Sequence, residues 1–98
     1  MAIKALIKRH FRKELNHDAH YHNAEIRALA TVQAGYISGQ TMVDINNPDE
    51  MIIISTWESK EDWDNWHNSS VRKDYYKKLR FLLESEEEIS FYSVGARR

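Results

Sequence analysis

Three tryptophans lie close together in the second half of the chain, where they can line a site for a flat organic molecule. Trp57 ends an apolar segment, and Trp63 and Trp66 follow three residues apart, which places these two on one side of a helix. A buried indole N–H usually finds a hydrogen-bond partner, so one of these rings can donate to a ligand oxygen. The alternative is that the three rings are ordinary core packing.

His67 and two adjacent tyrosines are the candidates for acid–base and hydrogen-bond chemistry. His67 has an ordinary pKa near neutrality, about 6.5, so it is the best general base unless its position after Trp66 turns it to solvent. Tyr75 and Tyr76 point roughly 100° apart on a helix, so one is expected to pack inward. The other lines a cavity or faces solvent, and its hydroxyl can donate to a phenolate or a peroxide.

Arg9 and Arg72 are the candidates for binding an anionic group. Arg9 shares one face of an extended segment with Ala5, Ile7 and Phe11, and a guanidinium on such a face needs an anionic partner or water. It can hold an anionic substrate, but we expect an ion pair at the sheet edge or in a dimer interface. Arg72 begins a helical segment, and we expect it to form a surface or interface salt bridge.

Several other chemistries are excluded or disfavoured. The chain has no cysteine, which excludes disulfides, thiolate catalysis and Cys-based metal sites. His17 and His20 can share a helix face that His22 cannot join, so no metal site is expected and these histidines should lie at the surface. The net charge of −1 lacks the basic excess of a nucleic-acid-binding protein, and no apolar run is long enough to span a membrane. We expect neither partner, and a cytoplasmic protein.

One small domain must position these residues, because 98 residues support a single core. The apolar patterns predict strands over 2–11, 36–43, 51–57 and 89–94. A helix should begin at a cap on Asn16 or Asp18 and end near residue 34, with Gly35 just past its end. A second helix should begin after Ser59, break at 68–70 and continue as a second segment with one row of side chains facing the core. This inward stripe comprises Val71, Tyr75, Leu79 and Leu82. The acidic run 84–88 is typical of a solvated turn.

The order β-α-β-β-α-β predicts an α+β protein with a ferredoxin-like fold, in which a four-stranded antiparallel sheet carries both helices on one face. Ile52, Ile53 and Ile54 make the strand at 51–57 apolar on both sides. The face without helices therefore needs another cover. We expect a homodimer that packs sheet against sheet.

From residue 3 to residue 94, the chain resembles the antibiotic biosynthesis monooxygenase family of dimeric α+β barrels. The resemblance is carried by Leu6-Ile7-Lys8-Arg9, Ala34-Gly35-Tyr36-Ile37-Ser38-Gly39, Asn47-Pro48-Asp49-Glu50, the run Ile54-Ser55-Thr56-Trp57-Glu58-Ser59-Lys60-Glu61-Asp62-Trp63, and Trp66, Arg72 and Tyr92. Two departures are Ala34-Gly35, where the family has proline–glycine, and Arg12-Lys13-Glu14-Leu15, where it has a glycine-bearing turn. The resemblance implies a homodimer with a small-molecule cavity between helices and sheet, and catalysis without metal, flavin or haem.

We therefore expect a cofactor-independent monooxygenase that acts on a small aromatic or quinol-type compound. The expected catalytic residues are Tyr76, His67 and Trp66, and the expected substrate-binding residues are Arg9, Trp57, Trp63, Tyr75 and Arg72. One alternative is a non-catalytic small-molecule-binding dimer of the same fold.

A haem-binding or haem-degrading relative is a second alternative. Haem-degrading relatives have an asparagine on the first strand, a tryptophan in the helix after the third strand, and a histidine ten residues beyond that tryptophan. Here Trp66 fits the tryptophan position, but Tyr76 stands in the histidine position. The first strand offers Lys8, Arg9 and His10 and no asparagine. The sequence therefore predicts that the protein does not degrade haem.

Overall fold

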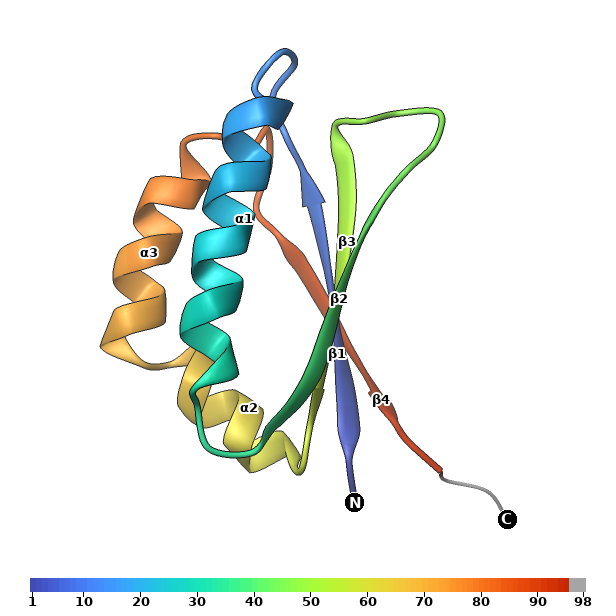
Figure 1. Ribbon diagram of the computed structural model, residues 1–98, viewed down its shortest axis with the longest axis vertical. Helices are drawn as coiled ribbons and strands as arrows, with labels where there is room; N and C mark the ends of the chain where they lie inside the picture. The colour runs from blue at the N-terminus through green and yellow to red at the C-terminus, as the bar shows by residue number, and fades with distance from the viewer. Residues whose placement is uncertain (96–98) are drawn as a thin grey trace.

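The computed structural model describes residues 1–95, except for the side chains of residues 16 and 17 (Figure 1). The elements in chain order are β1 (Ile3–His10), α1 (Asn16–Thr31), β2 (Tyr36–Val43), β3 (Glu50–Trp57), α2 (Lys60–His67), α3 (Ser70–Arg80) and β4 (Glu88–Ser93). The strands form one four-stranded sheet in the order β2-β3-β1-β4, and every described pair is antiparallel. This is the predicted α+β, ferredoxin-like arrangement, with its second helix divided into α2 and α3.

All three helices lie on one side of the sheet, as Figure 1 shows. Alternation along β1 buries Ala5, Ile7 and Arg9 beneath them, while the neighbouring side chains point to the opposite face. The predicted sharing of one face by Ala5, Ile7 and Arg9 is thus confirmed, and the structure shows that this face is the inner one. The core lies between the sheet and the helices, and its largest fully buried side chains are Trp57, Trp63, Phe11, Met51, Leu79 and Leu83.

The predicted helix ends are correct for α2 and α3 but not for α1. Ser59 Oγ accepts a hydrogen bond from the Asp62 N–H at 3.1 Å, and Ser69 Oγ accepts one from the Arg72 N–H at 3.2 Å. Helix α1, in contrast, has Leu15 at the cap position without a side-chain cap, and it ends at Thr31 rather than near residue 34. The expected cap on Asn16 or Asp18 is therefore wrong, because the helix already begins at Asn16, with Leu15 at the cap position.

Gly35 joins α1 to β2 in the left-handed conformation predicted for it. Its φ is +84°, and a Cβ built there would lie 2.3 Å from the Asp62 side chain. Only glycine fits this turn without strain, because both the backbone and the space exclude a side chain. The turn sets Tyr36, the first residue of β2, edge-on to the Trp57 ring with centroids 5.4 Å apart.

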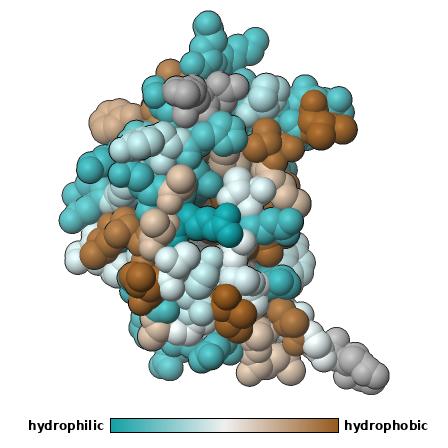
Figure 2. Space-filling view, in the orientation of Figure 1, coloured by the Kyte–Doolittle hydropathy of each residue, from teal (hydrophilic) through white to brown (hydrophobic). Residues whose placement is uncertain are grey.

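The face of the sheet without helices has an apolar centre. The register pairs Leu6 with Ile54, and the face also includes Ile52, Met42 and Tyr92. Leu6, Ile52 and Ile54 are half-buried, whereas Met42 and Tyr92 are exposed. Figure 2 shows that hydrophobic residues on the viewed side of the molecule form separate small groups among hydrophilic ones. In the described part of the chain, no helix combines the length and the apolar character needed to cross a membrane.

Candidate functional site

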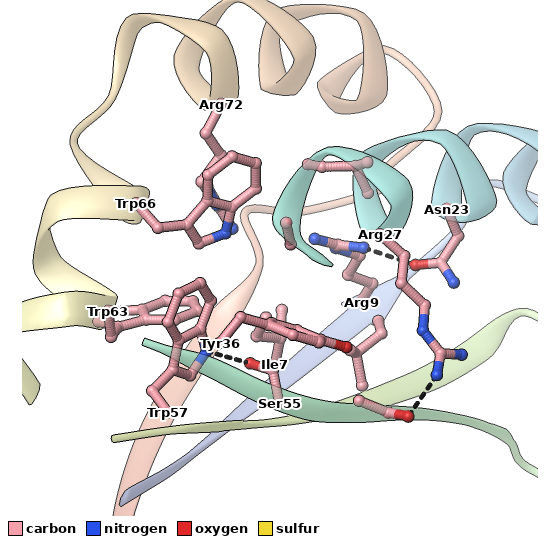
Figure 3. A pocket seen from close by; sticks show the side chains of 14 residues that line it. Ile7, Arg9, Asn23, Arg27, Tyr36, Ser55, Trp57, Trp63, Trp66 and Arg72 are labelled. Atoms are coloured by element: carbon pink, nitrogen blue, oxygen red, sulfur yellow. Dashed lines mark hydrogen bonds between the residues drawn. The ribbon is translucent and has the colours of Figure 1, made fainter. Parts of the chain in front are cut away.

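A cavity lies between the helices and the inner face of the sheet (Figure 3). Its free volume is about 40 Å³, and β1, β2, β3, α1, α2 and α3 all contribute to its wall. Most of the exposed lining is apolar, with a few charged and polar groups. Such a mixture is typical of small-molecule sites, where apolar surface supplies affinity and a few polar groups fix orientation.

Aromatic rings gather at one end of the cavity. Trp57, Trp63 and Trp66 are all at least 96% buried and line its wall. Trp57 and Trp63 meet edge to face, with centroids 5.9 Å apart and planes at 79°. The rings therefore form a corner rather than one flat wall. The indole N–H of Trp57 already donates to Ser55 Oγ at 3.0 Å, so it is not free for a ligand.

A buried ion-pair cluster of Arg9, Glu87 and Arg72 adjoins the cavity, and both arginines line its wall. One oxygen of Glu87 accepts from Arg9 Nε at 3.1 Å, and the other accepts from an Nη of Arg72 at 2.9 Å. The Glu87 side chain is only 6% exposed, and the arginines are 2% and 3% exposed. We call these three residues the Arg–Glu–Arg triad.

The triad confirms one expectation and corrects four. Arg9 does have an anionic partner, but the pair lies beneath the helices rather than at a sheet edge. Arg72 is buried and not at the surface, because α3 turns Arg72, Tyr75 and Leu79 inward and leaves Val71 46% exposed. The predicted inward stripe was thus wrong at its first position: the inward residue is Arg72, about 100° around the helix from Val71. The acidic run 84–88 is not uniformly solvated, because Glu87 is buried in the triad.

The triad leaves one positive charge in excess, because two guanidinium groups share one carboxylate. Burial lowers the pKa of Arg9, Glu87 opposes that shift, and the charge of Arg72 adds to it. Both arginines nevertheless stay charged, because a guanidinium is not deprotonated in proteins. Asn23 gives Arg9 a second acceptor, with 2.9 Å from an Nη of Arg9 to its Oδ1, and its own amide nitrogen donates to Thr41.

The Nε of Arg72 is buried and has no hydrogen-bond partner among the described residues. A buried donor without a partner costs about 1–3 kcal/mol, so an acceptor that reached this atom would be stabilised there. The guanidinium carbon of Arg72 lies 5.7 Å from the centre of the Trp63 ring. The unpaired N–H therefore belongs to a side chain that packs beside the tryptophan corner.

Two of the three predicted catalytic residues do not line this cavity. His67 and Tyr76 line a separate open groove, which Arg72 and Glu87 divide from the cavity. The Tyr76 hydroxyl donates to Glu86 at 2.8 Å and accepts from the Glu87 N–H at 3.3 Å. Of that predicted trio, the cavity wall contains Trp66 alone.

The ring of His67 stacks on Trp63, with centroids 5.4 Å apart and planes at 17°. Its Nδ1 is buried and has no partner within residues 1–95. Burial, followed by the nearby charge of Arg72, lowers the pKa of His67 below its ordinary value. The ring is therefore neutral at neutral pH and able to accept a proton, but on the groove side of the Arg–Glu–Arg triad.

Tyr75 lies in neither hollow. Its hydroxyl contacts α1, where it donates to Glu25 and pairs with His22 Nδ1 at 2.8 Å. His22 is thus engaged rather than free at the surface, and His20 is exposed. The side chain of His17 lies outside the described residues. No group of three potential metal-ligating side chains occurs in the part of the chain that the structure describes.

The remaining predicted binding residues do come together, and the structure adds others. Arg9, Trp57, Trp63 and Arg72 all line the cavity. Sequence reasoning did not select Glu87, although residues 87, 89 and 91 alternate in phase with the inward face of β4. It also missed the other polar wall residues Asn23, Arg27, Tyr36 and Ser55. Arg27 reaches across from α1 to the Gly39 carbonyl oxygen, as the dashed line in Figure 3 marks.

Comparison with known proteins gives one family match. The model of the family described as "Antibiotic biosynthesis monooxygenase" matches residues 8–78. A curated relative named "Heme-degrading monooxygenase", from Halalkalibacterium halodurans, is 31% identical over 65 residues. That match covers 61% of this chain, and it spans only 54% of the relative's own length.

Solved structures with the same fold include a conserved protein from Methanosarcina mazei Go1, with a TM-score of 0.86 and 20% identity. The match covers 94% of this chain and 91% of that one. Another is SnoaB, a cofactor-independent oxygenase from Streptomyces nogalater, with a TM-score of 0.84 and 13% identity. Here the match covers 100% of this chain and 96% of that one. At these identities the similarity shows the shared fold.

Proposed function

Because the chain belongs to the antibiotic biosynthesis monooxygenase family, we propose that it is a monooxygenase that oxidises a small aromatic or quinol-type compound in this cavity without metal, flavin or haem. A balanced reaction of this kind converts a phenol and O2 into a quinone and water. One oxygen atom enters the ring carbon, and the other leaves as water with the two hydrogens that the substrate loses. The substrate itself supplies all the electrons.

The observation that carries this proposal is an apolar, tryptophan-lined cavity with a net positive wall. A phenol must lose its proton before it can reduce O2. The excess charge of Arg9 and Arg72 stabilises the resulting anion in a site that largely excludes water. We assign substrate contact to Trp66, Arg9 and Arg72. From the groove, His67 and Tyr76 can act only through the Arg–Glu–Arg triad.

Oxygen uptake tests the proposal. Protein dialysed against a chelator and free of flavin should consume O2 with at least one member of a panel of naphthols and quinols, faster than the protein-free rate. An Arg72→Gln variant should lose at least tenfold, because one electrostatic donor at a developing anion is typically worth about 10²–10³ in rate. Lys77→Gln, which removes an exposed charge from the same helix, is the matched control. If the wild-type rate equals the protein-free rate throughout the panel, the protein is instead a non-catalytic small-molecule-binding module.

Haem degradation is the candidate that the Halalkalibacterium halodurans relative suggests. The residues here do not fit a haem. Tyr76, at the position of the expected histidine, faces the groove with its hydroxyl engaged by Glu86 and Glu87. Burial is the largest cause that raises the pKa of Tyr76, which disfavours the tyrosinate needed to bind ferric iron. We therefore derive no reaction through haem, and haemin added in the oxygen experiment should leave its Soret band unshifted.

We also propose that the working unit is a homodimer that packs through the open face of the sheet. The support is the apolar centre around Leu6, Ile52 and Ile54, which none of the helices in the described part of the chain covers. Light scattering at micromolar concentration should give twice the chain mass, and Ile54→Lys should give a folded monomer because it places a charge near Lys4 and Lys8. Ile45→Lys, at a 95% exposed loop position, is the control that should stay dimeric. A monomeric wild type would contradict the proposal.

A further inference from the structure

We infer that the cavity binds a planar aromatic carboxylate, with its ring against the tryptophan corner and its carboxylate on the unpaired N–H of Arg72. This inference rests on the proposed function only in taking the cavity as the substrate site. It names a substrate class, an aromatic acid, that family membership does not specify. Three observations carry it: the charge of the triad, the unpaired atom of Arg72 and the layout of the wall.

The Arg–Glu–Arg triad has one positive charge that no carboxylate of the triad compensates. Arg9 and Arg72 are each at least 97% buried, and Glu87 is their sole carboxylate partner among the described residues. A buried charge without full compensation is costly, whereas a singly charged anion in the cavity would make the wall neutral. An ordinary phenol, with a pKa of about 10, carries no charge at neutral pH.

The unpaired atom gives the charge a position. Glu87 accepts a hydrogen bond from an Nη of Arg72 at 2.9 Å. The Nε of Arg72 remains buried and has no partner within the described residues. A guanidinium donates several N–H bonds in one plane, a geometry that suits a carboxylate. A ligand carboxylate that accepts a hydrogen bond from Nε of Arg72 would satisfy the N–H that Glu87 leaves unpaired.

The layout of the wall defines the rest of the ligand. In Figure 3 the tryptophans lie on one side of the cavity and the Arg9–Asn23 pair lies on the other, with Arg72 beside Trp66. A molecule that fills this space has an apolar planar body and one polar end. The free space inside the cavity, about 40 Å³, limits the ligand to a small aromatic acid rather than a large polycycle.

Calorimetry with matched ligand pairs tests the inference without any turnover. Benzoate is compared with benzamide, and naphthoate with naphthamide, because each pair differs in charge and hardly in shape. The carboxylates should bind at least tenfold more tightly, as expected for a hydrogen bond to a charged partner. Equal affinities, or tighter binding of the amides, would overturn the inference.

Variants and pH identify the group responsible. Arg72→Gln should weaken naphthoate binding at least tenfold, whereas Lys77→Gln should change it less than twofold. The affinity should stay constant between about pH 5.5 and 8, because neither the arginines nor the carboxylate titrates there. Affinity that falls as the pH rises through this range would place the charge on a histidine and contradict the assignment. If Arg72→Gln does not fold, the wild-type ligand pairs and the pH profile still decide.

A nitrophenol separates the two sources of an anionic oxygen. It ionises near neutral pH, so binding as a phenolate would strengthen as the pH rises. If the nitrophenolate binds more tightly than naphthoate, the site selects phenolates and the carboxylate assignment is wrong. Oxygen uptake without carboxylate preference would overturn only this inference. Carboxylate preference without oxygen uptake would uphold it and leave the monooxygenase proposal to fail alone.

Discussion

Replacement of Glu87 by glutamine should lower the free energy of unfolding by about 3–5 kcal/mol, because it leaves two buried guanidinium groups without a counter-charge. The amide keeps the size of the side chain but only one of the two acceptor oxygens, so the loss combines the missing charge with one missing hydrogen bond. For a domain of this size, the same change should lower the melting temperature by more than about 10 °C. Urea and thermal denaturation at neutral pH, followed by circular dichroism, measure both quantities.

The neighbouring Glu86 offers a matched control. It pairs with Arg80 at 3.2 Å, but its side chain is 70% exposed. Glu86→Gln should therefore cost less than about 1 kcal/mol, as solvent-exposed ion pairs usually do. If the free energy of unfolding falls by the same small amount in both variants, Glu87 does not compensate the arginines in solution. That result would also contradict the argument that the cavity wall needs a ligand anion.

The sequence was sufficient for the architecture because the fold depends on local periodicity. Alternation along 2–11 predicted that Arg9 shares one face of β1 with Ala5 and Ile7, and the structure shows that this face is buried. The serines at positions 59 and 69 predicted the starts of α2 and α3, because a short hydroxyl side chain is the residue type that caps a helix. Family resemblance then pointed to a cavity between the helices and the sheet.

The sequence was not sufficient for the charged part of the site. Periodicity indicates which face a residue occupies but not which distant residue it meets, and Arg9 and Glu87 are 78 positions apart. Glu87 lies in a run of acidic residues, and such a run is typical of a solvated turn. The run as a whole therefore gave no sign that Glu87 lies on the same face as Ile89. The hydrophobicity of Val71 suggested a stripe that the buried pairing of Arg72 with Glu87 overrides.

The break between α2 and α3 explains the separation of the predicted catalytic residues. Trp66 and Tyr76 are ten residues apart, which would fix their directions at about 80° to each other only if one continuous helix carried both. Asn68 and Ser69 end α2 and cap α3, so the rotation of one helix does not extend into the other. Trp66 consequently lines the cavity, whereas Tyr76 lines the groove behind the Arg–Glu–Arg triad.

Replacement of the whole triad distinguishes a structural role from a functional one. A buried ion-pair cluster is often no more stable than apolar side chains of similar volume, although the removal of one member is severe. Arg9→Met, Arg72→Met and Glu87→Met together should therefore bring stability back to within about 2 kcal/mol of the wild type. Methionine suits this purpose because its flexible chain fills irregular space. Asn23 loses the donor that Arg9 supplied, so a gain over the wild type is not expected.

The triple variant should fold well yet lose the preference for naphthoate over naphthamide, as measured by the same calorimetry. That outcome would mean that the two arginines and Glu87 serve the ligand, because packing alone can replace them in the fold. Stability as low as that of Glu87→Gln would mean instead that the triad holds the helices on the sheet. In that case, the excess positive charge would be a structural compromise rather than the basis of recognition.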